Sequence, residues 1–156
     1  MAGEKVYETL AVWDPVRPDT VVISCVDGRW RPCIQEFATN YLNITPHTDF
    51  MAVPGGIEPL TLFDFVPKDF NFFRRRLEAL VAAHGTRRIV AIAHQDCSWY
   101  RERRIGPITI DLQQRQIADL KRAAARIREM FPEMVVATYF ARLNAETPPR
   151  VVFESV

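Results

Sequence analysis

A chain of 156 residues has room for one hydrophobic core and is short for two ordinary domains. Its 48% hydrophobic and 25% charged residues are typical of a folded globular protein and argue against disorder. The formal net charge of +1 gives no electrostatic reason to expect nucleic acid or a membrane as a partner. A small-molecule substrate is therefore the expectation.

Targeting signals and the cysteine count narrow the class further. No apolar run approaches the roughly 20 residues that span a bilayer, and the first residues lack the basic and then apolar pattern of a signal peptide. We therefore expect a cytoplasmic protein in which residues 1–156 form a single domain. The odd number of cysteines, three, favours metal binding or catalysis over a disulfide framework in a reducing compartment.

The predicted elements alternate between strands and helices. Residues 20–26 form a β-branched and apolar run, typical of a strand buried on both faces, and an Asp-Gly turn follows it. Pro32 suits the first turn of a helix whose apolar residues recur at helical spacing, and residues 50–53 predict a short strand before a Pro-Gly-Gly loop.

The second half of the chain continues this alternation. Further helices are expected at residues 68–84, with Gly85 as the stop, and 111–131, and further strands at 88–93, 134–140 and 151–153. This order implies an α/β fold with a mostly parallel open sheet of about four to five strands flanked by helices.

Cysteine and histidine side chains follow two of these strands. Cys25 ends the first strand, whereas His94 and Cys97 follow the third. Ligands of open α/β sheets gather at the carboxyl ends of strands, so the three side chains converge if the two strands are neighbours. Two thiolates and one imidazole suit zinc, and three protein ligands leave a fourth position open. Zinc lowers the pKa of a bound water to about 7, which makes hydroxide available to attack a small electrophile.

These residues resemble the motifs of a known family. The segment Cys25-Val26-Asp27-Gly28-Arg29, followed by His94-Gln95-Asp96-Cys97, resembles the C-x-D-x-R and H-x-x-C pair of the β-carbonic anhydrases. Residues 49–56 resemble the second strand and glycine-containing loop of that family, so the likeness covers about residues 20–100.

The resemblance implies a β-carbonic anhydrase-like fold and zinc-dependent reversible hydration of carbon dioxide to bicarbonate by zinc-bound hydroxide. It implies that Cys25, His94 and Cys97 are the zinc ligands. It also implies catalytic roles for Asp27, which accepts a hydrogen bond from the metal-bound water, and for Arg29, which holds Asp27. A carboxylate beside an arginine stays ionised, which suits that role.

The chain also departs from the family pattern. Ser98-Trp99-Tyr100 stands where the family continues with small, glycine-like residues, so an indole near the metal would narrow or redirect the pocket. Family active sites lie at dimer interfaces, so the resemblance implies a homodimer or higher homo-oligomer. Five phenylalanines fit either such an interface or a single-chain core. They are Phe63, Phe65, Phe70, Phe72 and Phe73.

Other interpretations remain open from the sequence. One alternative is a hydrolase of COS or CS2. Another is a catalytically inert zinc-binding relative in which Trp99 or Asp27 closes the fourth position. The run from Cys25 to Arg31 also fits C-x-x-G-x-x-R, the phosphate loop of cysteine-dependent phosphatases, with Cys25 as nucleophile. That motif leaves the second cysteine segment unexplained. Cys33 has no partner at metal-ligand spacing, and we predict a structural role for it.

Overall fold

The computed structural model describes residues 3–44, 47–62, 64–102 and 111–156. The strands are β1 (Thr20–Cys25), β2 (Asp49–Val53), β3 (Arg88–His94), β4 (Val135–Leu143) and β5 (Val151–Ser155). The α-helices are α1 (Arg31–Asn40), α2 (Pro67–His84), α3 (Ser98–Glu102) and α4 (Leu112–Met130), and a short 3-10 helix, η1, covers Glu58–Thr61. The predicted strands and the longer helices are all present, whereas α3 and η1 were not predicted.

The five strands form one sheet in the order β2-β1-β3-β4-β5. The first four strands of that order are parallel, and β5 runs antiparallel to β4. The predicted α/β fold with a mostly parallel sheet is therefore confirmed. The chain passes from β1 to one side of the sheet at β2 and then crosses to the other side at β3, so strand order reverses between β1 and β3. Ligand sites of open α/β sheets form at the carboxyl ends of strands at such a point.

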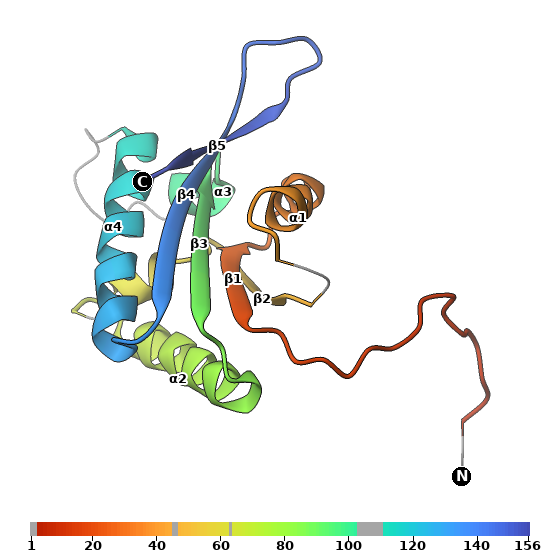
Figure 1. The fold of residues 1–156 in the computed structure, drawn as a ribbon. Helices are drawn as coiled ribbons and strands as arrows, with labels where there is room; N and C mark the ends of the chain where they lie inside the picture. Colours follow the sequence, from red (N-terminus) through yellow and green to blue (C-terminus); the bar gives the residue numbers. More distant parts are fainter. Residues whose placement is uncertain (1–2, 45–46, 63, 103–110) are drawn as a thin grey trace.

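Helices cover both faces of the sheet (Figure 1). Successive side chains of a strand point to opposite faces, so Val21 and Ile23 of β1 pack on the side of α2 and α4, whereas Val22 packs on the side of α1. The larger core includes these helical residues: Phe70, Phe73, Leu77, Leu120 and Ile127. The strands are thus buried on both faces, as their continuous apolar runs predict.

The phenylalanines that follow the glycine loop divide between interior and surface. Phe70 and Phe73 are buried in the core, whereas Phe65 and Phe72 are 73% and 60% exposed. Phe63 lies outside the described residues. Interior packing therefore accounts for two of the rings, whereas Phe65 and Phe72 lie at the surface, with the guanidinium of Arg76 5.1 Å from the ring of Phe72.

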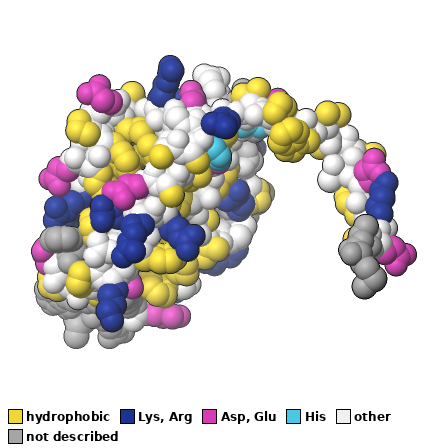
Figure 2. All heavy atoms as spheres, turned by 90° about the horizontal axis from the view of Figure 1, so that it is seen from below, with side chains coloured by type: hydrophobic (Ala, Val, Ile, Leu, Met, Phe, Trp, Pro, Cys, Tyr) yellow, Lys and Arg dark blue, Asp and Glu magenta, His cyan; other side chains and the backbone are white. Residues whose placement is uncertain are grey.

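Residues 3–18, which we call the arm, contain neither helix nor strand and project away from the sheet (Figure 1). The arm is tied to the body by an ion pair of 2.9 Å between Asp14 and His47 and by a hydrogen bond from Arg17 to the carbonyl of Ala83. Large apolar side chains lie exposed along it, as Figure 2 shows. They are Val6, Tyr7, Leu10, Val12, Trp13 and Val16, between 62% and 98% exposed.

None of the helices in the described part of the chain has the length and apolar character needed to cross a membrane.

The helix ends follow local sequence signals. Gly85 adopts φ +69 at the end of α2, and its N–H donates to the carbonyl of Val81, which confirms it as the predicted stop. Asp111 caps α4, because its carboxylate accepts the N–H of Gln113.

Candidate metal centre

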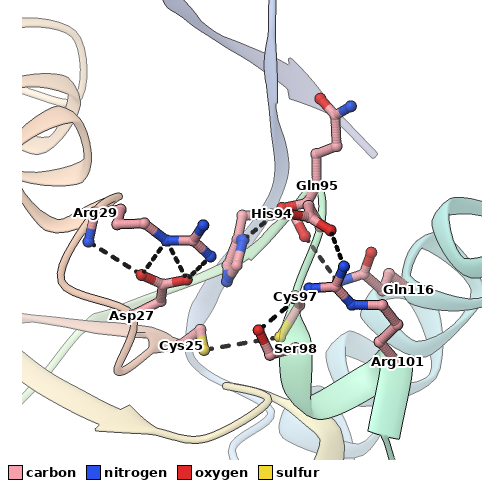
Figure 3. A network of polar contacts seen from close by, with 10 residues as sticks. Cys25, Asp27, Arg29, His94, Gln95, Cys97, Ser98, Arg101 and Gln116 are labelled. Carbon is pink, nitrogen blue, oxygen red and sulfur yellow. Dashed lines mark hydrogen bonds and ion pairs between the residues drawn. The ribbon is translucent and has the colours of Figure 1, made fainter.

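Three potential metal ligands meet at the carboxyl edge of β1 and β3. Cys25 is the last residue of β1 and His94 the last of β3, and these strands are parallel neighbours. Cys97 lies immediately before α3. The two sulfurs are 3.8 Å apart, and one ligand atom from each of the three residues lies within 4.8 Å of the others. Figure 3 shows the three side chains pointing toward one another.

A sharp turn brings Cys97 back toward Cys25. Asp96 adopts φ +57, a left-handed conformation that aspartate tolerates better than most residues. An ion pair of 3.0 Å joins Asp96 to Arg101 on α3 and ties the turn to the helix that follows it. The side chain of Cys97 is buried, so the turn delivers it inward from an exposed loop.

The imidazole of His94 is oriented as a metal-binding imidazole needs to be. It is 1% exposed, and its Nδ1 lies 2.8 Å from the carbonyl oxygen of Gln95. A carbonyl only accepts, so Nδ1 carries the hydrogen and Nε2 presents its lone pair. That Nε2 is buried with no hydrogen-bond partner among the described residues. Leaving such an atom unsatisfied costs about 1–3 kcal/mol, and ligation of a metal removes this penalty. The donor set and the orphaned nitrogen together fit zinc.

Two further side chains hold the end of β3 in place. The Nε2 amide of Gln116, which is 2% exposed on α4, donates a 2.8 Å hydrogen bond to the carbonyl of His94. The ring of Trp30 lies 4.8 Å from the imidazole, centroid to centroid. Neither residue was predicted from the sequence. Gln116 interrupts the apolar stripe between Leu112 and Leu120, and a polar side chain at such a position indicates a buried hydrogen bond.

The surroundings of the two sulfurs shift the pKa values of their thiols. The contact between the two sulfurs is the main cause that lowers the pKa of Cys25, and His94 and the backbone of Asp27 and Gly55 act in the same direction. The same sulfur–sulfur contact and burial raise the pKa of Cys97. The two thiols are therefore shifted in opposite directions, and the contact between them favours ionisation of one sulfur. Thiolate character of this kind is what a divalent cation requires.

Asp27 and Arg29 lie beside this cluster as an oriented pair. The Nε of Arg29 donates to Oδ1 of Asp27 at 3.0 Å, and Nη2 donates to Oδ2 at 2.6 Å. The backbone N–H of Arg29 adds a bond of 3.1 Å to Oδ1. These hydrogen bonds lower the pKa of Asp27 to about 2. Within the described residues the ligand cluster comprises only the two cysteines and the histidine, and Asp27 is turned to Arg29 instead (Figure 3).

The arginine of the alternative phosphatase motif lies elsewhere. The guanidinium of Arg31 lies 3.7 Å above the ring of Phe50, which pairs with Val22 across the sheet. Val22 precedes Cys25 by three residues, which is about 10 Å along a strand. This placement does not present Arg31 to the Cys25 sulfur. Cys33 is half-buried on α1 and does not belong to the ligand cluster.

The chain matches one family model and several solved structures. A family model described as "Putative carbonic anhydrase" matches residues 18–150. The fold is similar to that of β-carbonic anhydrase isoform I from the protozoan Trichomonas vaginalis, with a TM-score of 0.53 and 15% identity, covering 93% of this chain and 87% of that one. A second similar structure, of tetrameric β-carbonic anhydrases from the filamentous ascomycete Sordaria macrospora, has a TM-score of 0.48 and 17% identity, covering 88% of this chain and 80% of that one. Comparison with curated proteins found no match.

The family match spans both strand ends that carry the ligand cluster. At 15% identity, the similarity to the Trichomonas vaginalis structure shows a shared fold and nothing more. The shared fold and the family match agree on a divergent relative of the β-carbonic anhydrases.

Proposed function

The chain belongs to the carbonic anhydrase family that this model describes, and from this premise we propose that it hydrates carbon dioxide reversibly to bicarbonate with zinc. The observation that carries the proposal is the convergence of Cys25, His94 and Cys97 within 4.8 Å, with the Nε2 of a buried histidine lacking any other partner among the described residues. Two sulfurs and one nitrogen are the donor set of a catalytic zinc site that keeps one position open.

Zinc, when bound by these three residues, would supply a Lewis acid that makes water nucleophilic near neutral pH. The chain's own contribution is to fix the donors. The carbonyl of Gln95 selects the tautomer of His94, and N–H groups from the glycine loop and from α3 stabilise the two thiolates. Such outer contacts orient the ligands and tune their basicity.

Asp27 would orient the reacting water. With a pKa of about 2 it is ionised at neutral pH, and only about one molecule in 10⁵ carries the proton at pH 7. Asp27 is therefore suited to accepting a hydrogen bond and poorly suited to storing a proton, so the proton of the reaction passes to solvent. Arg29 would hold the carboxylate of Asp27 in a fixed orientation, because it donates a hydrogen bond to each of the two oxygens.

The same geometry bears on the alternatives. In the inert relative considered from the sequence, Asp27 or Trp99 closes the fourth position, whereas here Asp27 is engaged by Arg29 and the indole of Trp99 packs against Gly55. A phosphatase needs Arg31 at the thiolate, and the Arg31 guanidinium lies over Phe50. Hydrolysis of COS or CS2 uses the same open position and the same linear shape of substrate, so it remains a close variant of the proposal.

Zinc analysis combined with stopped-flow carbon dioxide hydration tests the proposal. We expect one zinc per chain and chelator-sensitive turnover in the wild type. Asp27→Asn preserves the shape of the side chain and removes its charge, so we expect it to keep zinc and lower kcat on the order of 100-fold.

Bound zinc without carbon dioxide hydration or COS hydrolysis would instead identify an inert relative. Phosphatase activity that is insensitive to chelators would identify a cysteine-dependent phosphatase. Undiminished turnover in Asp27→Asn would refute the role of Asp27.

The remaining features of this proposal follow from the family and the sequence. We propose that residues 1–156 act as one β-carbonic anhydrase-like domain, that the chain works as a homodimer or higher homo-oligomer, and that it acts in the cytoplasm. The exposed apolar side chains of the arm support the oligomer, because such a surface is costly in water.

A further inference from the structure

The indole of Trp99 lies against the glycine loop. Gly55 adopts φ +75 there, and a Cβ built on it would lie 2.3 Å from Cδ1 and 2.8 Å from Nε1 of Trp99. Real Cβ atoms do not approach other atoms so closely. The indole therefore fills the space that any side chain at position 55 would need, and Trp99 and Gly55 interlock.

This contact joins the two segments that carry the sulfurs. Gly55 belongs to the loop that follows β2, beside the end of β1 that carries Cys25, and Trp99 follows Cys97 by two residues in α3. The indole thus bridges the loop behind one ligand and the first turn of α3 behind the other. A rigid ring braced on backbone has little freedom to move aside.

The accessible side of the ligand cluster can be located from burial. His94 and Cys97 are buried, whereas Cys25, Asp27 and Trp99 are each only partly buried. The partly buried residues therefore form the side of the cluster that solvent reaches. Trp99 is the bulkiest of them.

We propose that Trp99 sets the size of ligand that reaches the candidate metal centre, and that it admits small molecules such as CO2, COS or CS2 while excluding molecules that carry an aromatic ring. The substrate class named here rests on the proposed function. The steric part does not, because it concerns access to Cys25 whether or not a metal is bound. A bulky side chain beside a site gives specificity by excluding ligands that are too large.

Access is measured on metal-free protein carrying Cys33→Ser, so that alkylation at Cys25 is read without the other accessible thiol. Iodoacetamide and its N-phenyl derivative share the same reactive group and differ in bulk, and mass spectrometry of peptides locates the product. We expect the ratio of the two rates in the wild-type background to exceed that of a free thiol by about tenfold or more. Trp99→Gly and Trp99→Leu should both bring the ratio back toward that of a free thiol.

Trp13→Gly is the matched control, because it removes an 82% exposed indole from the arm and should leave the ratio unchanged. An unchanged ratio in both Trp99 variants would overturn the proposal. Trp99→Leu keeps an apolar side chain at the position, so it reports on access even if the glycine variant unfolds.

A double-mutant cycle tests the interlock separately. Gly55→Ala should lower zinc affinity about 10-fold or more, and adding Trp99→Gly should recover part of the loss, because the steric clash is removed while the backbone strain of alanine at φ +75 remains. Gly56→Ala is the control, since its Cβ would lie 3.0 Å from backbone atoms of Ser24 and Cys25. Trp99→Gly cannot relieve that clash, so equal recovery in both glycine variants would contradict the interlock.

The two proposals fail in different ways. Carbon dioxide hydration with no size selectivity at Cys25 would refute the role of Trp99 and leave the activity standing. Size selectivity that depends on Trp99, in a chain without carbon dioxide hydration, would refute the proposed activity and support the role of Trp99.

Discussion

Cys25 and Cys33 lie eight residues apart and are both half-buried, yet only Cys25 faces His94 and Cys97. We expect Cys25→Ser to abolish stoichiometric zinc, because a neutral hydroxyl replaces a thiolate ligand and leaves only two strong donors. Cys33→Ser should retain one zinc per chain. Metal analysis of the two purified variants checks this, and equal zinc contents in both would contradict the assignment of the ligands.

At the residue scale, sequence motifs were enough to select the three residues that the structure brings together, because their side chains belong to two short patterns at strand ends. The contacts that orient them were not accessible in the same way. His94 is positioned by the carbonyl of its neighbour Gln95, and a carbonyl direction depends on backbone conformation that no side-chain pattern encodes. Trp30 meets His94 only because the turn after Cys25 brings α1 over the strand ends.

At the element scale, α4 and β3 are joined by one buried hydrogen bond. Gln116→Leu keeps the packing volume roughly constant but leaves the carbonyl of His94 without its donor. We expect this variant to lower the free energy of unfolding by about 1–3 kcal/mol, because a buried acceptor loses its partner. We also expect zinc affinity to fall about 10-fold, because an outer contact to a ligand is lost.

Gln114→Leu is the matched control, because Gln114 is exposed on the same helix. Denaturant unfolding and zinc titration of the two variants measure both effects. If Gln116→Leu were no more damaging than Gln114→Leu, the hydrogen bond would not support the site.

Elements with a clear apolar pattern were predictable, and the two shortest helices were not. The stripe of α4 and the buried runs of β1 and β3 extend over enough residues to show a period or a continuous apolar pattern. By contrast, α3 covers five residues and η1 four, which is too little chain for a helical period to appear. Their position is set by tertiary contacts, such as that of Trp99 with the glycine loop.

At the scale of the whole molecule, the arm carries the most exposed large apolar side chains among the described residues, and we expect it to pack on a second copy. Replacing Val6, Leu10 and Trp13 together by serine should lower the molar mass in solution to that of a smaller assembly, because the buried apolar area is lost. Light scattering after size exclusion measures this.

Phe65→Ser with Phe72→Ser is the comparison, since these rings are also exposed but lie outside the arm. A reduction in mass only with the second set would move the interface to that surface, and a wild-type monomer would refute the oligomer.

The central claim is that two sulfurs and one imidazole from distant parts of the chain hold one zinc. X-ray absorption at the zinc edge of the purified, zinc-loaded protein tests it directly. We predict a four-coordinate shell with two sulfurs at about 2.3 Å and two nitrogen or oxygen atoms at about 2.0–2.1 Å. A shell of only nitrogen and oxygen, or one with a single sulfur, would contradict the account.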